Sequence, residues 1–68
     1  MKTITGLRWL NKPQKVALVQ VIEDETPSYY LGTSPTGNTE QDCARDIVNQ
    51  GSRLPRIVGE AMFKANRE

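Results

Sequence analysis

One strand-like segment, residues 15–23, is apolar on both of its sides, and this sets the main requirement that the fold must meet. Successive side chains of a β-strand point to opposite faces of a sheet. The residues that alternate to one face are Val16, Leu18 and Ile22, and those on the other are Ala17, Val19 and Val21. Gln20 alone interrupts the pattern. This segment therefore predicts a central strand whose two faces both need cover.

Two weaker strand patterns flank this segment, at residues 3–10 and 28–33. Turn-forming residues separate them from it, at 11–14 and 24–27. Short turns of this kind join neighbouring antiparallel strands. The first half of the chain therefore predicts a three-stranded antiparallel β-meander.

Helical patterns follow at residues 39–50 and 55–66. Thr39, with Asp42 three residues later, resembles a capping box, and Pro55 suits the first turn of a helix. The apolar stripe of the second pattern consists of Leu54, Ile57, Val58, Ala61, Met62 and Ala65. We expect a single α+β domain, residues 1–68, with both short helices packed on one sheet face and the other face uncovered.

Phe63 stands apart from this stripe. At about 100° per residue it lies roughly 170° from the centre of the stripe, so in a regular helix it faces away from the core. A frayed last turn that folds the ring back inward is the alternative.

Composition excludes several classes of function. The 68 residues include no histidine and a single cysteine, Cys43. Histidine is the commonest general base and metal ligand, and a structural zinc site needs about four Cys or His ligands. We therefore expect no catalytic residues, no cofactor and no metal, and we interpret the protein as non-enzymatic.

The segment 32–39 has the glycine spacing of a phosphate-binding loop, but Asn38 stands where that loop has lysine. Glu40 and Asp42 follow directly and would repel an anion. The pattern therefore predicts an ordinary loop that ends in a helix N-cap.

The longest apolar run, residues 16–19, is far shorter than the roughly 18 residues of a membrane helix. The N-terminal residues lack the apolar stretch of about 7 to 15 residues that a signal peptide needs. With one cysteine, an internal disulfide is excluded. We expect a cytoplasmic protein that does not contact a membrane.

An uncovered sheet face predicts a binding surface, since buried apolar surface drives association. We expect the protein to self-associate, as a homodimer for example, or to dock on a larger protein and modulate or inhibit it. The residues expected to bind the partner are Trp9, Val19, Val21, Tyr29, Tyr30 and Phe63.

Nucleic-acid binding is the alternative interpretation. Residues 1–22 carry four bases and no acid, although the net charge of the chain is only +1. Positive side chains neutralise phosphates, and exposed aromatic rings can stack on bases. The residues expected to contact nucleic acid in this alternative are Arg8, Lys12, Lys15, Lys64 and Arg67.

Overall fold

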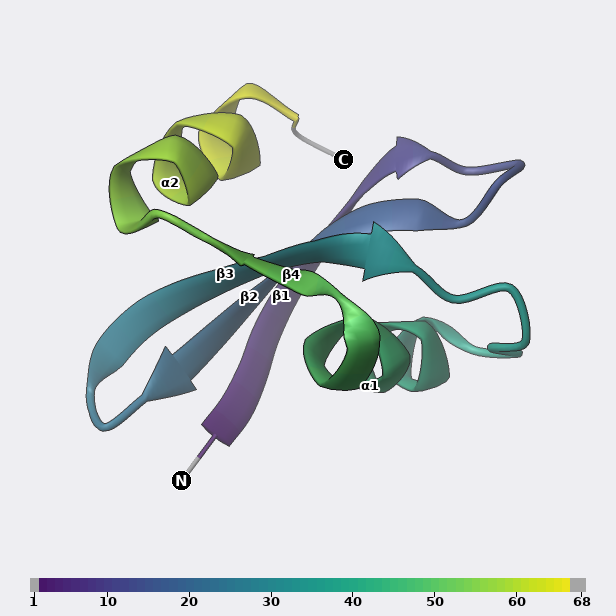
Figure 1. Ribbon diagram of the computed structural model, residues 1–68, viewed down its shortest axis with the longest axis horizontal. Coiled ribbons are helices and arrows are strands. Elements are labelled where there is room, and N and C mark those ends of the chain that lie inside the picture. The colour runs from purple at the N-terminus through teal and green to yellow at the C-terminus, as the bar shows by residue number, and fades with distance from the viewer. Residues whose placement is uncertain (1, 67–68) are drawn as a thin grey trace.

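The computed structural model describes residues 2–66 and shows an antiparallel sheet with two helices (Figure 1). The elements in chain order are β1 (Lys2–Asn11), β2 (Val16–Glu23), β3 (Thr26–Thr33), α1 (Glu40–Gln50), β4 (Ser52–Leu54) and α2 (Arg56–Ala65). The strands lie in the order β1-β2-β3-β4, and each neighbouring pair is antiparallel. The α+β class, the meander and both helices are confirmed, with bounds that differ from the expected ones by one or two residues.

The expectation of three strands is wrong, because β4 adds a fourth. This short strand pairs with the outer side of β3, where Leu54 lies opposite Tyr29 and Ser52 opposite Leu31. Three residues are too few to show the alternation that marks a strand in a sequence. Gly51 permits the approach, since a Cβ built on it would lie 2.7 Å from the Leu31 carbonyl oxygen.

The expectation that both helices share one sheet face is also wrong. Tyr29 and Tyr30 are neighbours in β3 and therefore point to opposite faces. Tyr30 belongs to the cluster that contains Ile47 of α1, whereas Tyr29 contacts Phe63 and Gly59 of α2. Figure 1 shows the two helices apart, on either side of the crossing strands. The physical reason is β4, which carries the chain along the sheet edge between the two helices.

The main core lies between α1 and one face of the sheet. Its buried members are Ala17, Val19, Val21, Tyr30, Ala44 and Ile47, with Leu7, Trp9 and Val48 packed around them. On the opposite face, Leu18 is also fully buried. Both sides of β2 are therefore covered, as its double apolar pattern requires.

The β2–β3 turn has an unusual backbone. Glu23 pairs with Thr26, which leaves Asp24 and Glu25 as a two-residue turn. Both have positive φ, 49° and 68°. This is the conformation of a type I′ turn, whose twist suits a β-hairpin.

No helix within residues 2–66 has the length and apolar character needed to cross a bilayer.

Candidate protein-interaction surface

The residues expected to bind a partner lie mostly in the core. Val19 and Val21 are completely buried, and Tyr29 and Tyr30 are only 3% and 7% exposed. Trp9 is half-buried against the core cluster. The expectation of an uncovered apolar sheet face is therefore wrong, because α1 covers one face and α2 packs on the other.

Helix α2 packs on the sheet through its only buried residue, Gly59. A Cβ built on Gly59 would lie 2.6 Å from Cγ of Tyr29, closer than real side-chain contacts allow. The missing side chain therefore lets the helix backbone rest directly on the tyrosine.

Phe63, one turn further along, points to the same side of α2. The tip of its ring lies over Gly6 of β1, where a built Cβ would be 2.7 Å from Cζ. Its ring centroid is 5.7 Å from that of Tyr29, and the Arg8 guanidinium lies 4.1 Å above the Phe63 ring. Edge-tilted aromatic pairs and cation–π contacts are both favourable.

The predicted outward position of Phe63 is therefore wrong, and fraying is not the reason. The helix extends to Ala65, and the amide of Asn66 still donates to the Met62 carbonyl at 3.1 Å. The whole helix is instead rotated about its axis from the orientation that its apolar stripe predicts.

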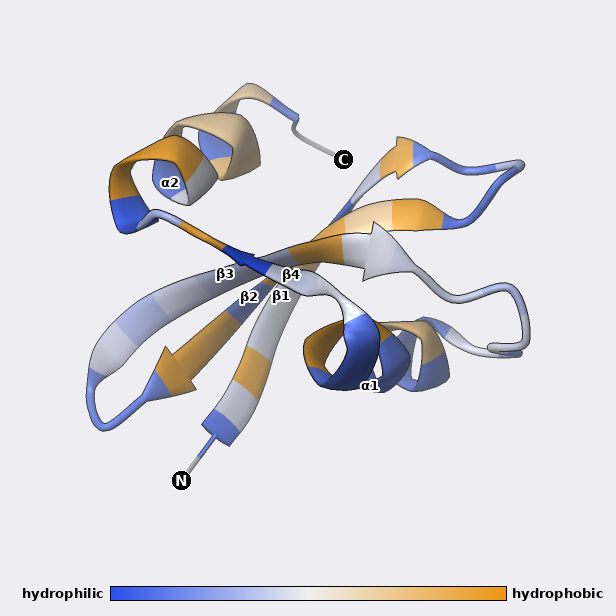
Figure 2. Ribbon diagram, in the orientation of Figure 1, coloured by the Kyte–Doolittle hydropathy of each residue, from blue (hydrophilic) through white to orange (hydrophobic). Residues whose placement is uncertain are grey.

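This rotation turns most of the apolar stripe toward solvent. Ile57 is 85% exposed and Val58 46%, and Ala61 and Ala65 are exposed as well. We call these four residues the α2 outer face. Figure 2 shows the apolar segments of α2 at the outside of the ribbon arrangement. The expectation that this stripe packs inward is wrong, with only Leu54 and Met62 half-buried.

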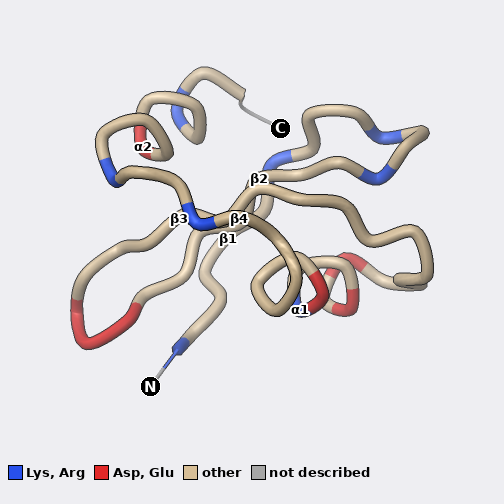
Figure 3. Tube along the Cα trace, viewed as in Figure 1, with Lys and Arg blue, Asp and Glu red and all other residues tan. Residues whose placement is uncertain are grey.

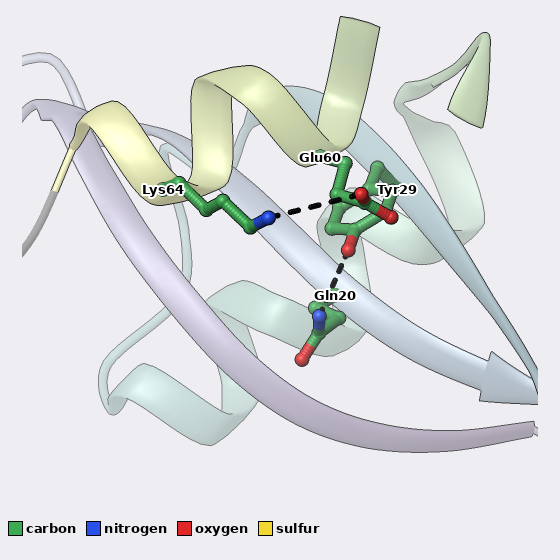
Figure 4. A network of polar contacts seen from close by, with 4 residues as sticks. All are labelled: Gln20, Tyr29, Glu60 and Lys64. Atoms are coloured by element: carbon green, nitrogen blue, oxygen red, sulfur yellow. Dashed lines mark hydrogen bonds and ion pairs between the residues drawn. The ribbon is translucent and has the colours of Figure 1, made fainter. Parts of the chain in front are cut away.

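One edge of the α2 outer face carries opposite charges. Glu60 and Lys64, one helical turn apart, form an ion pair with 3.9 Å between Oε1 and Nζ (Figure 4). Their side chains remain 42% and 77% exposed. Below the helix, Gln20 donates from Nε2 to the Tyr29 hydroxyl at 3.0 Å. The apolar face is thus bordered by charges that remain accessible to a partner.

Lysine and arginine residues are spread over several parts of the described chain (Figure 3), and of the nucleic-acid alternative Arg8 lies in β1 and Lys64 in α2. Arg8 stacks on Phe63, and Lys15 donates from Nζ to the Gly37 carbonyl at 2.8 Å. Lys12 is exposed in the β1–β2 turn, and Arg67 lies outside the described residues. Two of these cations thus support the fold, and nucleic-acid binding stays a prediction.

The glycine-containing loop before α1 is built into the core. Ser34 is buried and donates to Asp46 Oδ2 at 2.7 Å. A Cβ on Gly37 would lie 2.6 Å from the Cys43 sulfur, so this glycine closes the loop onto the helix. Thr39 accepts a hydrogen bond from the Asp42 amide, which makes it the N-cap of α1. These contacts give the loop a structural role.

A polar cluster lies where β2 and β3 approach their turn. The Tyr30 hydroxyl donates to Glu23 Oε1 at 2.8 Å, and Arg53 Nη2 donates to the Ser28 hydroxyl at 3.2 Å. The hydrogen bond from Tyr30 lowers the pKa of Glu23, and Ser28, Lys2 and Arg53 add to this effect against a smaller opposing effect of burial. The cluster joins β4 and β1 to the sheet centre by charge and hydrogen bonding.

Comparison of the chain with protein-family models, curated proteins and solved structures gave no match. The α2 outer face is therefore identified from the geometry alone. A signal for it was present in the sequence, because a glycine inside a helix often marks close packing on its side. Gly59 and Phe63 are four residues apart and share that side.

Proposed function

We propose that this chain is a non-enzymatic protein-interaction module that binds through the α2 outer face. Exposure of Ile57 and Val58 on one helix surface carries the proposal. Complete burial of a Val or Ile side chain is worth about 1.5 to 3 kcal/mol, so a partner that covers both gains substantial binding energy. Self-association, or docking on a larger protein to modulate it, would provide this cover.

Ile57 and Val58 contribute little to the packing of α2 on the sheet, which supports the same proposal. Single exposed apolar residues are common on protein surfaces. Here, however, α2 contacts the sheet through Gly59 and Phe63, whereas its branched aliphatic residues face outward. Ile57, at 85% exposure, adds almost nothing to the core. A binding role explains why a helix places its apolar residues on the solvent side.

The experiment is site-specific photo-crosslinking in living cells. A photoreactive phenylalanine analogue replaces Ile57, and in a matched variant it replaces Asn49, an exposed residue of α1. Both positions are on helix surfaces, so neither substitution should disturb folding. We expect covalent protein adducts from position 57 and few from position 49. Equal adduct yields from both positions, or none from position 57, would contradict the proposal.

A further inference from the structure

We propose that the occupant of the α2 outer face is a second copy of this chain, with the two α2 helices antiparallel about a twofold axis near Ala61. The inference rests on the proposed function and names its partner. Twofold dimers are the commonest protein oligomers, and in them the same surface must complement itself. The α2 outer face meets this requirement in shape and in charge.

Ile57, Ala61 and Ala65 follow one another at intervals of four residues along α2. Residues at this spacing lie on one side of a helix. Antiparallel packing about Ala61 places Ile57 opposite Ala65 of the partner subunit, and Ala61 opposite its own copy. Each large side chain then faces a small one, which is the arrangement that fills an interface without voids.

The two edges of the α2 outer face differ in charge. At about 100° per residue, Glu60 and Lys64 lie on one side of the line through Ala61, and Val58 and Met62 lie on the other. An antiparallel twofold brings like edges together. Lys64 then reaches Glu60 of the partner subunit, and Val58 meets Met62 of the partner subunit.

A parallel twofold gives the opposite result. It would place the charged edge of one helix against the apolar edge of the other, which desolvates these charges and gives them no partner on the other chain. Charge complementarity thus selects the antiparallel arrangement. Because Glu60 and Lys64 already form an ion pair within one chain, the dimer adds cross-chain pairs to groups that are already positioned.

The size of the surface determines the expected affinity. A helix of ten residues is about 15 Å long, so two such helices bury less than the roughly 1,200 Å² of a stable interface. We therefore expect a dimer that exchanges rapidly, with a dissociation constant of about 10 μM to 1 mM. The net charge of +1 gives little repulsion between copies.

The test is sedimentation equilibrium of the whole chain over a range of concentrations. We expect a monomer–dimer equilibrium for the unaltered chain and a monomer for Ile57→Glu. Glu60→Lys and Lys64→Glu should each weaken the dimer about fivefold, because each places like charges together at both symmetric contacts. The double variant should restore dimerisation. Circular dichroism confirms that each variant is folded, and Asn49→Glu on α1 is the matched control.

The outcomes separate this inference from the proposed function. Restored dimerisation in the double variant, together with chain-to-chain adducts from a photoreactive residue at position 57, would support the second copy. A chain that stays monomeric up to 1 mM would overturn the inference, and adducts to a different protein would then keep the proposed function. Absence of both self-association and adducts would overturn both.

Discussion

Gly59 of α2 lies so close to Tyr29 of β3 that a Cβ on the glycine would be 2.6 Å from the tyrosine Cγ. The contact determines which side of the helix meets the sheet, because no other residue type fits there without displacing the tyrosine. Phe63 follows one turn later and packs over Gly6. Together they orient α2 so that Ile57 faces solvent.

Gly59→Ala should lower the stability of the protein. Alanine favours a helix over glycine by about 1 kcal/mol, but the added methyl collides with Tyr29, and overpacking typically costs about 1 to 3 kcal/mol. We expect a net loss of about 0 to 2 kcal/mol in the free energy of unfolding, measured with urea. Ala61→Gly, at an exposed position in the middle of α2, is the control and should lose about 1 kcal/mol from helix propensity alone. A Gly59→Ala variant more stable than the original would refute this contact.

Phe63 and Ile57 should differ sharply when each is truncated to alanine. The Phe63 ring contacts Tyr29 and Arg8, so its loss should cost about 2 kcal/mol of unfolding free energy. Ile57 is 85% exposed, and its truncation should change stability by less than about 0.5 kcal/mol. Denaturation at low protein concentration avoids any contribution from association. If Ile57→Ala proved the more damaging change, α2 would have the opposite orientation.

Glu25→Gly should stabilise the β2–β3 turn. Glu25 has φ of 68°, a left-handed conformation that costs a residue with a Cβ about 1 kcal/mol or more. Glycine adopts it freely, so we expect a gain of about 1 kcal/mol in thermal or urea unfolding. The control is Thr36→Gly in the loop before α1, where φ is not positive and glycine should bring no gain. Equal effects at both positions would contradict the turn geometry.

Glu23 should titrate below the usual range for a glutamate. Its pKa is lowered mainly by the hydrogen bond from Tyr30, which favours the ionised carboxylate. A carboxyl whose pKa is lower in the folded than in the unfolded state stabilises the fold above the unfolded pKa. This contribution is lost as the pH falls through the folded pKa.

An NMR titration of the Glu23 side-chain carboxyl carbon measures this effect. Tyr30→Phe removes the hydroxyl and should raise the pKa of Glu23 toward its ordinary value. Tyr29→Phe is the matched control, because the Tyr29 hydroxyl accepts a hydrogen bond from Gln20 and not from a group near Glu23. This substitution should leave the pKa of Glu23 unchanged. The assignment fails if the pKa of Glu23 is the same in both variants.

The sequence was sufficient to predict β1, β2, β3 and both helices, because hydropathy alternation and capping residues act locally. Residues 15–23 predicted a central strand that needs cover on both faces, and the two helices supply it. The placement of both helices on one face failed because β4 resembles a loop in the sequence.

The candidate site was harder to predict, for a physical reason. A hydropathy pattern assigns the inner side of a helix to its apolar residues, but Gly59 packs by having no side chain and contributes nothing to that pattern. Gly6 makes room for the Phe63 ring in the same way, because it has no side chain. The pairing of β1 with β2 is what brings Gly6 to this place beneath α2. Such contacts join residues far apart in the chain, and the hydropathy period of a single helix does not reveal them. For this reason the period assigned the outer face of α2 to the core.

Helix α2 packs on the sheet through Gly59 and Phe63 and leaves Ile57 outside. A nuclear Overhauser spectrum recorded at low protein concentration tests this orientation of α2. We expect cross-peaks from the Phe63 ring to the Gly6 α-protons and the Tyr29 ring, and none from the Ile57 methyls to the sheet. Cross-peaks between the Ile57 methyls and Tyr29, without those from Phe63, would contradict this orientation.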